Sequence, residues 1–171
     1  MPTAMQRLAL LLGACALFGI SAAHGADSDG EILAIAQAAN TAEIDAGRLA
    51  KAQARNPQVR QFAQQVVQDH EAMNSDLAKL AYLELLESGE SRRIRQEAMA
   101  ELDKLKSVQE GAFDMAYIEQ QIRMHETVSS LMQDELLPNT RDARLKAALD
   151  KAAPKIRSHL QMARQIRSSM D

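Results

Sequence analysis

The sequence predicts an all-α fold, and three observations predict it. Aromatic residues make up only 3% of the 171 residues and Trp is absent, while good helix formers such as Ala, Leu, Gln, Glu, Arg and Met are abundant. Seven Gly and four Pro are too few for a chain with many tight turns. Apolar residues recur at alternating spacings of three and four, as amphipathic helices require. A chain of this length is expected to form one domain with one core.

The N-terminal residues 1–25 are expected to be a signal peptide and not part of the fold. A basic Arg7, an apolar run over 8–20 and a stretch of small residues follow one another in the order of a secretory signal. The apolar run of about 13 residues is shorter than the ~20 that a membrane span needs. Cleavage is predicted after Gly25 or after Ala26.

The mature domain, residues 26–171, is therefore expected to be periplasmic or secreted, with no transmembrane helix. Cleavage removes Cys15, the only cysteine, so the mature domain has no disulfide and no thiolate ligand. The alternative is that the sequence ending at Cys15, Leu-Gly-Ala-Cys, is a bacterial lipoprotein box and that Cys15 carries a lipid anchor.

The first predicted helical hairpin covers residues 29–55 and 57–86. Ser28 followed by Glu31 forms a capping-box pattern before the first helix. Asn56-Pro57 marks the start of the second helix, because Asn caps well and Pro suits the first helical position. The expected apolar stripes are Ile32, Ile35, Ala39, Ala42, Ala46 and Leu49 on the first helix and Val59, Phe62, Val66, His70, Met73, Leu77 and Leu80 on the second.

A short charged helix over 91–107 is predicted next, and a second hairpin over 112–136 and 141–168 follows it. Pro138-Asn139-Thr140 marks the turn of that hairpin, and Pro154 predicts a kink or restart within its last helix. The third main helix admits two phases, one with Phe113, Tyr117, Met124, Val128 and Leu131 inward and one with Ile118, Ile122, His125, Val128 and Met132 inward.

Two hairpins joined by a longer connection predict a ferritin-like four-helix bundle, with the extra short helix inside the connection. The alternative is a simple up-down-up-down bundle with an added helix.

Three histidines, His70, His125 and His159, lie on three different main helices and on expected apolar stripes. A single histidine on such a stripe is more often a packed, hydrogen-bonded core residue. Inward ligands from facing helices are nevertheless how bundles build metal sites, and neutral imidazole is a common metal ligand. The three histidines are therefore candidate ligands of a transition metal ion.

The height of each residue along the bundle adds Glu43 to this candidate metal site. Glu43 lies about 13 residues before the first turn and His70 about 14 after it, so the two are nearly level. His125 lies about 13 residues before Pro138 and His159 about 21 after it. That mismatch of ~12 Å makes His159 doubtful as a partner of His125.

Several other functions are disfavoured. The Glu-x-x-His pattern of di-iron bundles is absent, since Val67, Ile122 and Ile156 stand three residues before the histidines. The nearby Met73 and Met162 suggest copper(I), although Met is a common core filler.

No catalytic constellation is visible, which predicts that the protein is not an enzyme. A net charge of −3 gives no reason to expect a nucleic-acid partner, and a homo-oligomer remains open.

The motifs together resemble a bacterial family, domain of unknown function 4142, over roughly residues 30–168. The resemblance implies an exported, ferritin-like periplasmic bundle with no established enzyme activity and with His at the positions of His70, His125 and His159; Met73 and Met162 are not part of it. It rests on Ala39-Asn40-Thr41-Ala42-Glu43-Ile44, Gly47-Arg48-Leu49-Ala50, Val59, Phe62-Ala63, Val67-Gln68-Asp69-His70, Phe113-Asp114, Tyr117-Ile118, His125, Pro154, His159-Leu160 and Ala163.

The leading hypothesis is an exported, non-catalytic bundle that binds a metal or small ligand through these histidines, with a role in envelope stress. The alternative is a structural or interaction protein in which the histidines only pack.

Overall fold

The structure is a computed structural model that describes residues 28–170. The predicted signal peptide and Cys15 lie outside the described residues. The all-α expectation is confirmed, because the described part of the chain forms helices and turns and contains no strand. The elements are α1 (Asp29–Gln53), α2 (Pro57–Ala78), α3 (Gly89–Ser107), α4 (Glu110–Leu131), the π-helix η1 (Met132–Leu136), α5 (Leu137–Asn139) and α6 (Ala143–Ser168).

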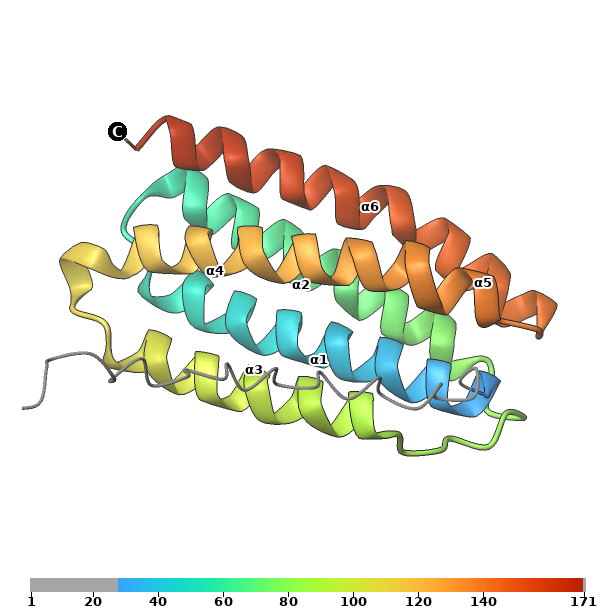
Figure 1. Cartoon of the computed structure of the whole chain (residues 1–171). Coiled ribbons are helices and arrows are strands. Elements are labelled where there is room, and N and C mark those ends of the chain that lie inside the picture. The colour runs from blue at the N-terminus through green and yellow to red at the C-terminus, as the bar shows by residue number, and fades with distance from the viewer. Residues whose placement is uncertain (1–27, 171) are drawn as a thin grey trace, which may run out of the picture.

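The four long helices α1, α2, α4 and α6 lie side by side (Figure 1). Helix α1 is antiparallel to α2, and α4 is antiparallel to α6. Because α2 and α4 run in the same direction, the connection between them must return along the whole length of the molecule. Helix α3 makes this return on the outside, packed mainly against α1.

Side-chain caps begin the first two helices where the sequence predicts them, whereas α3, α4 and α6 each begin two residues away from the predicted start. Ser28 and Glu31 form the complete capping box of α1. The side chain of Asn56 accepts a hydrogen bond from the backbone of Gln58, and Pro57 is the first residue of α2. Each cap satisfies backbone N–H groups that have no partner inside the helix.

Each hairpin turn is held by an aspartate of the other hairpin. The Asp114 carboxylate of α4 accepts hydrogen bonds from the backbone N–H groups of Arg55 and Asn56, the latter at 2.7 Å. The Asp29 carboxylate of α1 accepts from the backbone N–H groups of Arg141 and Asp142, at 2.8 and 3.0 Å. These two contacts fix the ends of the hairpins against each other.

The second helix ends at Ala78 and not near Leu86, which corrects the sequence prediction. The chain turns after Ala78, buries Leu80, and crosses the start of α1. There the Leu86 N–H donates to the Gly30 carbonyl at 3.3 Å. A local preference for helix in this leucine-rich segment is overridden because the chain must turn to place α3 against α1.

The second hairpin also differs from the expectation in detail. Pro138 lies inside α5, so the turn comes later, at residues 140–142. Helix α6 continues through Pro154 as one element, so the expected restart is wrong. The two phases of the third helix are not exclusive, because residues of both are buried along α4 before the π-helix η1 begins at Met132. Phe113 and Tyr117 of the first phase and His125 and Met132 of the second are all buried.

Candidate metal centre

A polar layer divides the apolar core into two clusters, and the three histidines lie in this layer. One cluster contains Ile35, Met73, Met132 and Ile156, and the other contains Ala46, Val66, Tyr117 and Ala163. Between them each long helix contributes buried polar side chains. These are Asn40 and Glu43 from α1, His70 from α2, Gln121 and His125 from α4, and His159 from α6.

The rings of His70, His125 and His159 face one another inside this layer. Their centroids are 5.3 to 5.9 Å apart, and each residue is at most 3% exposed. One ring nitrogen from each histidine lies within 4.8 Å of the corresponding nitrogens of the other two. The closest pair is Nε2 of His125 and Nδ1 of His159, which are 3.3 Å apart.

The neighbours of His125 show which of its nitrogens carries the proton. Nδ1 of His125 lies 2.9 Å from the backbone carbonyl oxygen of Gln121 and 3.4 Å from Oε1 of Glu43. The backbone carbonyl oxygen can only accept a hydrogen bond, and the carboxylate oxygen can only accept one when Glu43 is ionised. Nδ1 of His125 therefore donates, which leaves Nε2 with a free lone pair directed at His159.

His159 is oriented in the same way by Asp69 of α2. Nε2 of His159 lies 2.9 Å from Oδ2 of Asp69. Burial raises the pKa of the Asp69 carboxyl, but hydrogen bonds from Lys155, Gln65 and His159 outweigh it and bring that pKa to about 2. The ionised carboxylate accepts a hydrogen bond from Nε2–H, so neutral His159 has its free lone pair on Nδ1.

His70 completes the pattern through Asn40 of α1. Nδ1 of His70 lies 2.9 Å from Oδ1 of Asn40, whose amide nitrogen donates to Asn74 at 3.0 Å. The Asn40 oxygen is thus the acceptor and His70 Nδ1 the donor. Nε2 of His70 is buried without a hydrogen-bond partner among the described residues. Burial, followed by the two neighbouring histidines, lowers the pKa of His70 well below its usual value.

Glu43 lies behind His125 and not between the histidines. It contacts Nδ1 of His125, the nitrogen that faces away from His159, and its other oxygen accepts a hydrogen bond from the side chain of Gln121 at 2.8 Å. The described residues that could share one metal ion are the three histidines alone. Glu43 thus lies beside the outer nitrogen of His125, and its Oε1 is buried without a hydrogen-bond partner among the described residues.

His159 lies against His125, so the predicted mismatch in height between these two residues was wrong. The turn falls near residue 141, so His125 lies 16 residues before it (141 − 125) and His159 lies 18 after it (159 − 141). The difference of two residues corresponds to ~3 Å of helix rise. The error came from placing Pro138 in the turn, whereas it lies inside α5.

The sequence pattern did not predict that Asp69 orients His159 or that Asn40 orients His70. Asp69 adjoins His70 in the sequence, but adjacent helical residues point about 100° apart. Its partner is His159, which lies 90 residues further along the chain. Asn40 could have been identified as a candidate because it is a polar residue on the apolar face of α1.

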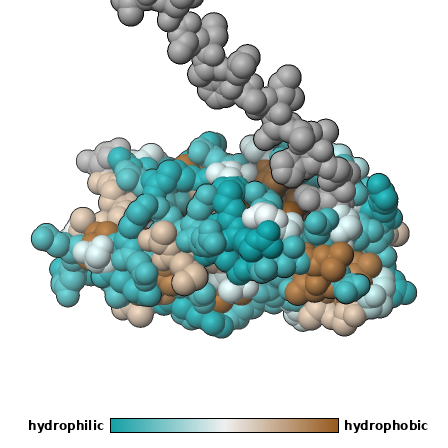
Figure 2. Space-filling view, turned by 60° about the horizontal axis from the view of Figure 1, so that its bottom comes forward, coloured by the Kyte–Doolittle hydropathy of each residue, from teal (hydrophilic) through white to brown (hydrophobic). Residues whose placement is uncertain are grey.

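None of the described helices has the length and apolarity that spanning a membrane requires. The face of the molecule shown in Figure 2 is mostly hydrophilic, with hydrophobic residues in separate small areas.

The comparisons identify one family. The model of a family described as a domain of unknown function, DUF4142, matches residues 19–166. No curated protein and no solved structure matches the chain.

Proposed function

We propose that this chain, which belongs to the DUF4142 family, binds one transition metal ion through His70, His125 and His159 and catalyses no reaction. In each histidine one nitrogen is held as a donor by a protein oxygen, and the other nitrogen is left free toward the common centre. This division of roles is typical of metal-binding histidines, in which the second nitrogen donates to a carboxylate or a carbonyl.

The observation that carries the proposal is the 3.3 Å distance between two free nitrogens, Nε2 of His125 and Nδ1 of His159. Two lone pairs at this distance repel each other unless a cation lies between them. Burial lowers the pKa of His159 despite its bond to Asp69, which disfavours a shared proton at neutral pH. Two nitrogens bound to one Zn²⁺ at ~2.0–2.1 Å with tetrahedral angles are themselves ~3.3–3.4 Å apart. The pair is thus already at ligand spacing.

The third ligand, His70, needs only a small movement. One of its ring nitrogens is at most 4.8 Å from a nitrogen of each of the others, at most about 1.5 Å beyond tetrahedral spacing, and a rotation of the ring can close this gap. Three neutral imidazoles suit Zn²⁺, Cu²⁺ or Ni²⁺ better than Mg²⁺ or Ca²⁺, which prefer oxygen ligands. Asp69 and Glu43 place two carboxylates behind the ligands.

We also propose that the fold is a ferritin-like four-helix bundle. The parallel directions of α2 and α4 and the long connection through α3 support this assignment, because a ferritin-like bundle has one such crossover. Histidines replace the carboxylate-rich ligands of di-iron bundles at the centre.

The proposed location is the periplasm or the exterior of a bacterial cell. The support is the order of basic, apolar and small residues over 1–25. A metal-binding protein in that compartment fits a role in holding metal during envelope stress.

Metal titration of the purified protein tests the proposal. Protein stripped with a chelator is titrated with Zn²⁺ and Cu²⁺ in a calorimeter, and metal content is measured after expression in the periplasm. We expect one ion per chain for the wild type. His125→Leu should lose the ion and still fold, because an apolar side chain removes the facing lone pairs.

Gln120→Leu is the matched control, since Gln120 is a buried polar residue of the same helix whose side-chain oxygen has no hydrogen-bond partner among the described residues. This variant should keep the ion. If the wild type binds neither metal, or if His125→Leu binds as well as Gln120→Leu does, the metal proposal fails. A His125→Leu variant at least as stable as a wild type that binds no metal supports the packing alternative.

A further inference from the structure

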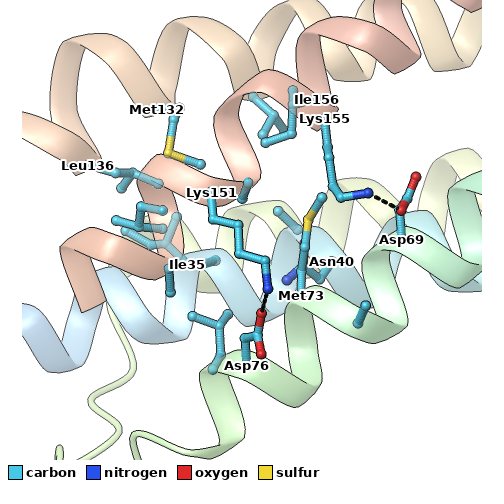
Figure 3. Close-up of a pocket in the computed structure, with 18 of the residues that line it drawn as sticks. Ile35, Asn40, Asp69, Met73, Asp76, Met132, Leu136, Lys151, Lys155 and Ile156 are labelled. Carbon is cyan, nitrogen blue, oxygen red and sulfur yellow. Dashed lines mark hydrogen bonds and ion pairs between the residues drawn. The ribbon is translucent and has the colours of Figure 1, made fainter. Parts of the chain in front are cut away.

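A cavity of about 110 Å³ lies beside the polar layer, between α1, α2, α6 and the π-helix η1 (Figure 3). Most of its lining surface is apolar, and its polar residues are engaged in hydrogen bonds or ion pairs with one another or with neighbouring side chains. Asn40 and Asp69, which orient His70 and His159, stand at the end of the cavity nearest the histidines. The cavity thus adjoins the candidate metal centre but contains none of its ligands. Its apolar lining includes Ile35, Ala39, Met73, Met132, Leu136 and Ile156.

The size and lining of the cavity favour a small apolar occupant over water. A water molecule needs two to four polar partners, and an engineered apolar cavity of ~150 Å³ stays dry and binds benzene or xenon. Three alanines in the walls, Ala36, Ala39 and Ala152, are buried and leave this space open. Larger side chains at these positions would fill it.

The charges at the mouth of the cavity cancel. Lys151 and Lys155 reach from α6 to α2, where Lys151 pairs with Asp76 at 2.6 Å and Lys155 pairs with Asp69 (Figure 3). Two positive and two negative side chains leave no net charge to attract an ionic group. An anionic head group would have to compete with a carboxylate that each lysine already contacts.

The π-helix η1 supplies part of the wall. Met132 and Leu136 are 4% and 2% exposed, and both line the cavity. Single π turns inside helices occur often at functional sites, and they cost hydrogen-bond geometry that a regular helix would keep. Here the π turn is the element that directs these two side chains inward beside Ile156.

We propose that this cavity is a binding site for a compact, uncharged, apolar molecule no larger than about the size of benzene. The site is separate from the proposed metal centre and does not depend on it. The neutral mouth sets the charge of the ligand, and the volume between the helices sets its size.

Methionine methyl NMR tests this site directly, because Met73 and Met132 line it and Met99 is 68% exposed on α3. The metal-free protein, labelled at the methionine methyl groups, is titrated with benzene, and a parallel titration uses hexanoate. We expect saturable shifts of Met73 and Met132, no shift of Met99, and weaker binding of hexanoate than of benzene.

Ala152→Leu fills the cavity and should weaken benzene binding by at least about tenfold, because the added side chain occupies the same volume. Ala147→Leu is the matched control, since Ala147 is exposed on the same helix. Ala36→Val fills the site from α1 and serves if Ala152→Leu does not fold.

The proposal is overturned if benzene produces no saturable shift in the wild type, or if the filled variants bind it as well as Ala147→Leu does. Tighter binding of hexanoate overturns it as well, because the ligand would then be an anionic amphiphile. Since the titrations use metal-free protein, each of these results leaves the metal proposal untouched.

Discussion

At the scale of single residues, the position of one proton on each imidazole determines the chemistry of the polar layer. Gln121, Asp69 and Asn40 each accept a hydrogen bond from one histidine and so direct its free nitrogen inward. These acceptors come from three different helices. The neighbouring residues therefore orient the three rings of the proposed metal site.

Asp69→Ala should weaken Zn²⁺ binding by about 10- to 100-fold without abolishing it, because His159 loses the carboxylate that orients it. A competition titration with a chelator of known affinity measures the change. Asp76→Ala is the matched control, since Asp76 lies on the same helix and pairs with Lys151 much as Asp69 pairs with Lys155. Equal affinities of the two variants would remove the orienting role of Asp69.

Gly30→Ala should destabilise the protein by about 1–3 kcal/mol, because a Cβ at this position would lie 2.1 Å from the Glu84 carbonyl oxygen. Gly111→Ala should instead stabilise it by about 0.5–1 kcal/mol, since its Cβ would meet nothing within 4 Å. Both glycines are the second residue of their helix, so the pair separates packing from helix propensity. Urea unfolding measures both changes, and similar effects of the two substitutions would contradict this account of Gly30.

At the scale of elements, the two hairpins are joined by contacts that local sequence does not reveal. The turn between α1 and α2 is held by α4, and the turn before α6 is held by α1. In Phe113-Asp114, the aspartate therefore has a structural role in the turn. Three arginines of α3, Arg92, Arg93 and Arg95, form ion pairs with nearby glutamates; Arg93 pairs with Glu90 and Glu97 on the helix surface.

Asp114→Ala should cost about 1–3 kcal/mol, because the backbone N–H groups of Arg55 and Asn56 lose their acceptor. Asp114→Asn should lose less, since the amide oxygen can still accept one of these hydrogen bonds. Thermal and urea unfolding of the metal-free protein measure the series. If both variants were as stable as the wild type, Asp114 would not hold the turn.

At the scale of the whole molecule, the polar layer joins the two hairpins. His70 comes from the first hairpin, and His125 and His159 come from the second. A bound ion would therefore cross-link the two halves of the core and stabilise the folded state by about 2.7 kcal/mol at a hundredfold excess over Kd. Two apolar clusters on either side of the layer hold the fold without the ion.

Acid should remove the contribution of the Asp76 ion pairs to the stability of the fold below about pH 4. Hydrogen bonds from Lys151 and Lys79 lower the pKa of Asp76 from 3.8 to about 2. A carboxyl whose pKa is lower in the folded than in the unfolded chain contributes stability above the unfolded value, and this contribution is lost as pH falls through the folded value. The stability difference between wild type and Asp76→Asn should therefore be largest above pH 4 and should shrink toward pH 2. Urea unfolding of metal-free protein at several pH values measures it, and a constant difference would refute the assignment.

Much of the fold could be predicted from sequence because its signals are local. Ser28 with Glu31 and Asn56 with Pro57 begin their helices as the sequence predicts. The end of α2 could not be predicted, because it depends on a contact between Leu86 and Gly30. The π turn and the late turn near residue 141 could not be predicted for a similar reason. Both change which residues lie at the same height along the bundle.

By itself the sequence determined the helical class, the starts of the first two helices and the three histidines on apolar stripes, because capping and helical periodicity act over a few residues. Only the tertiary structure decided that His159 contacts His125, that Asp69 accepts a hydrogen bond from His159 and that Glu43 lies on the outer side of His125. Those contacts join residues 34 to 90 positions apart, so they depend on how the helices pack and where each turn falls.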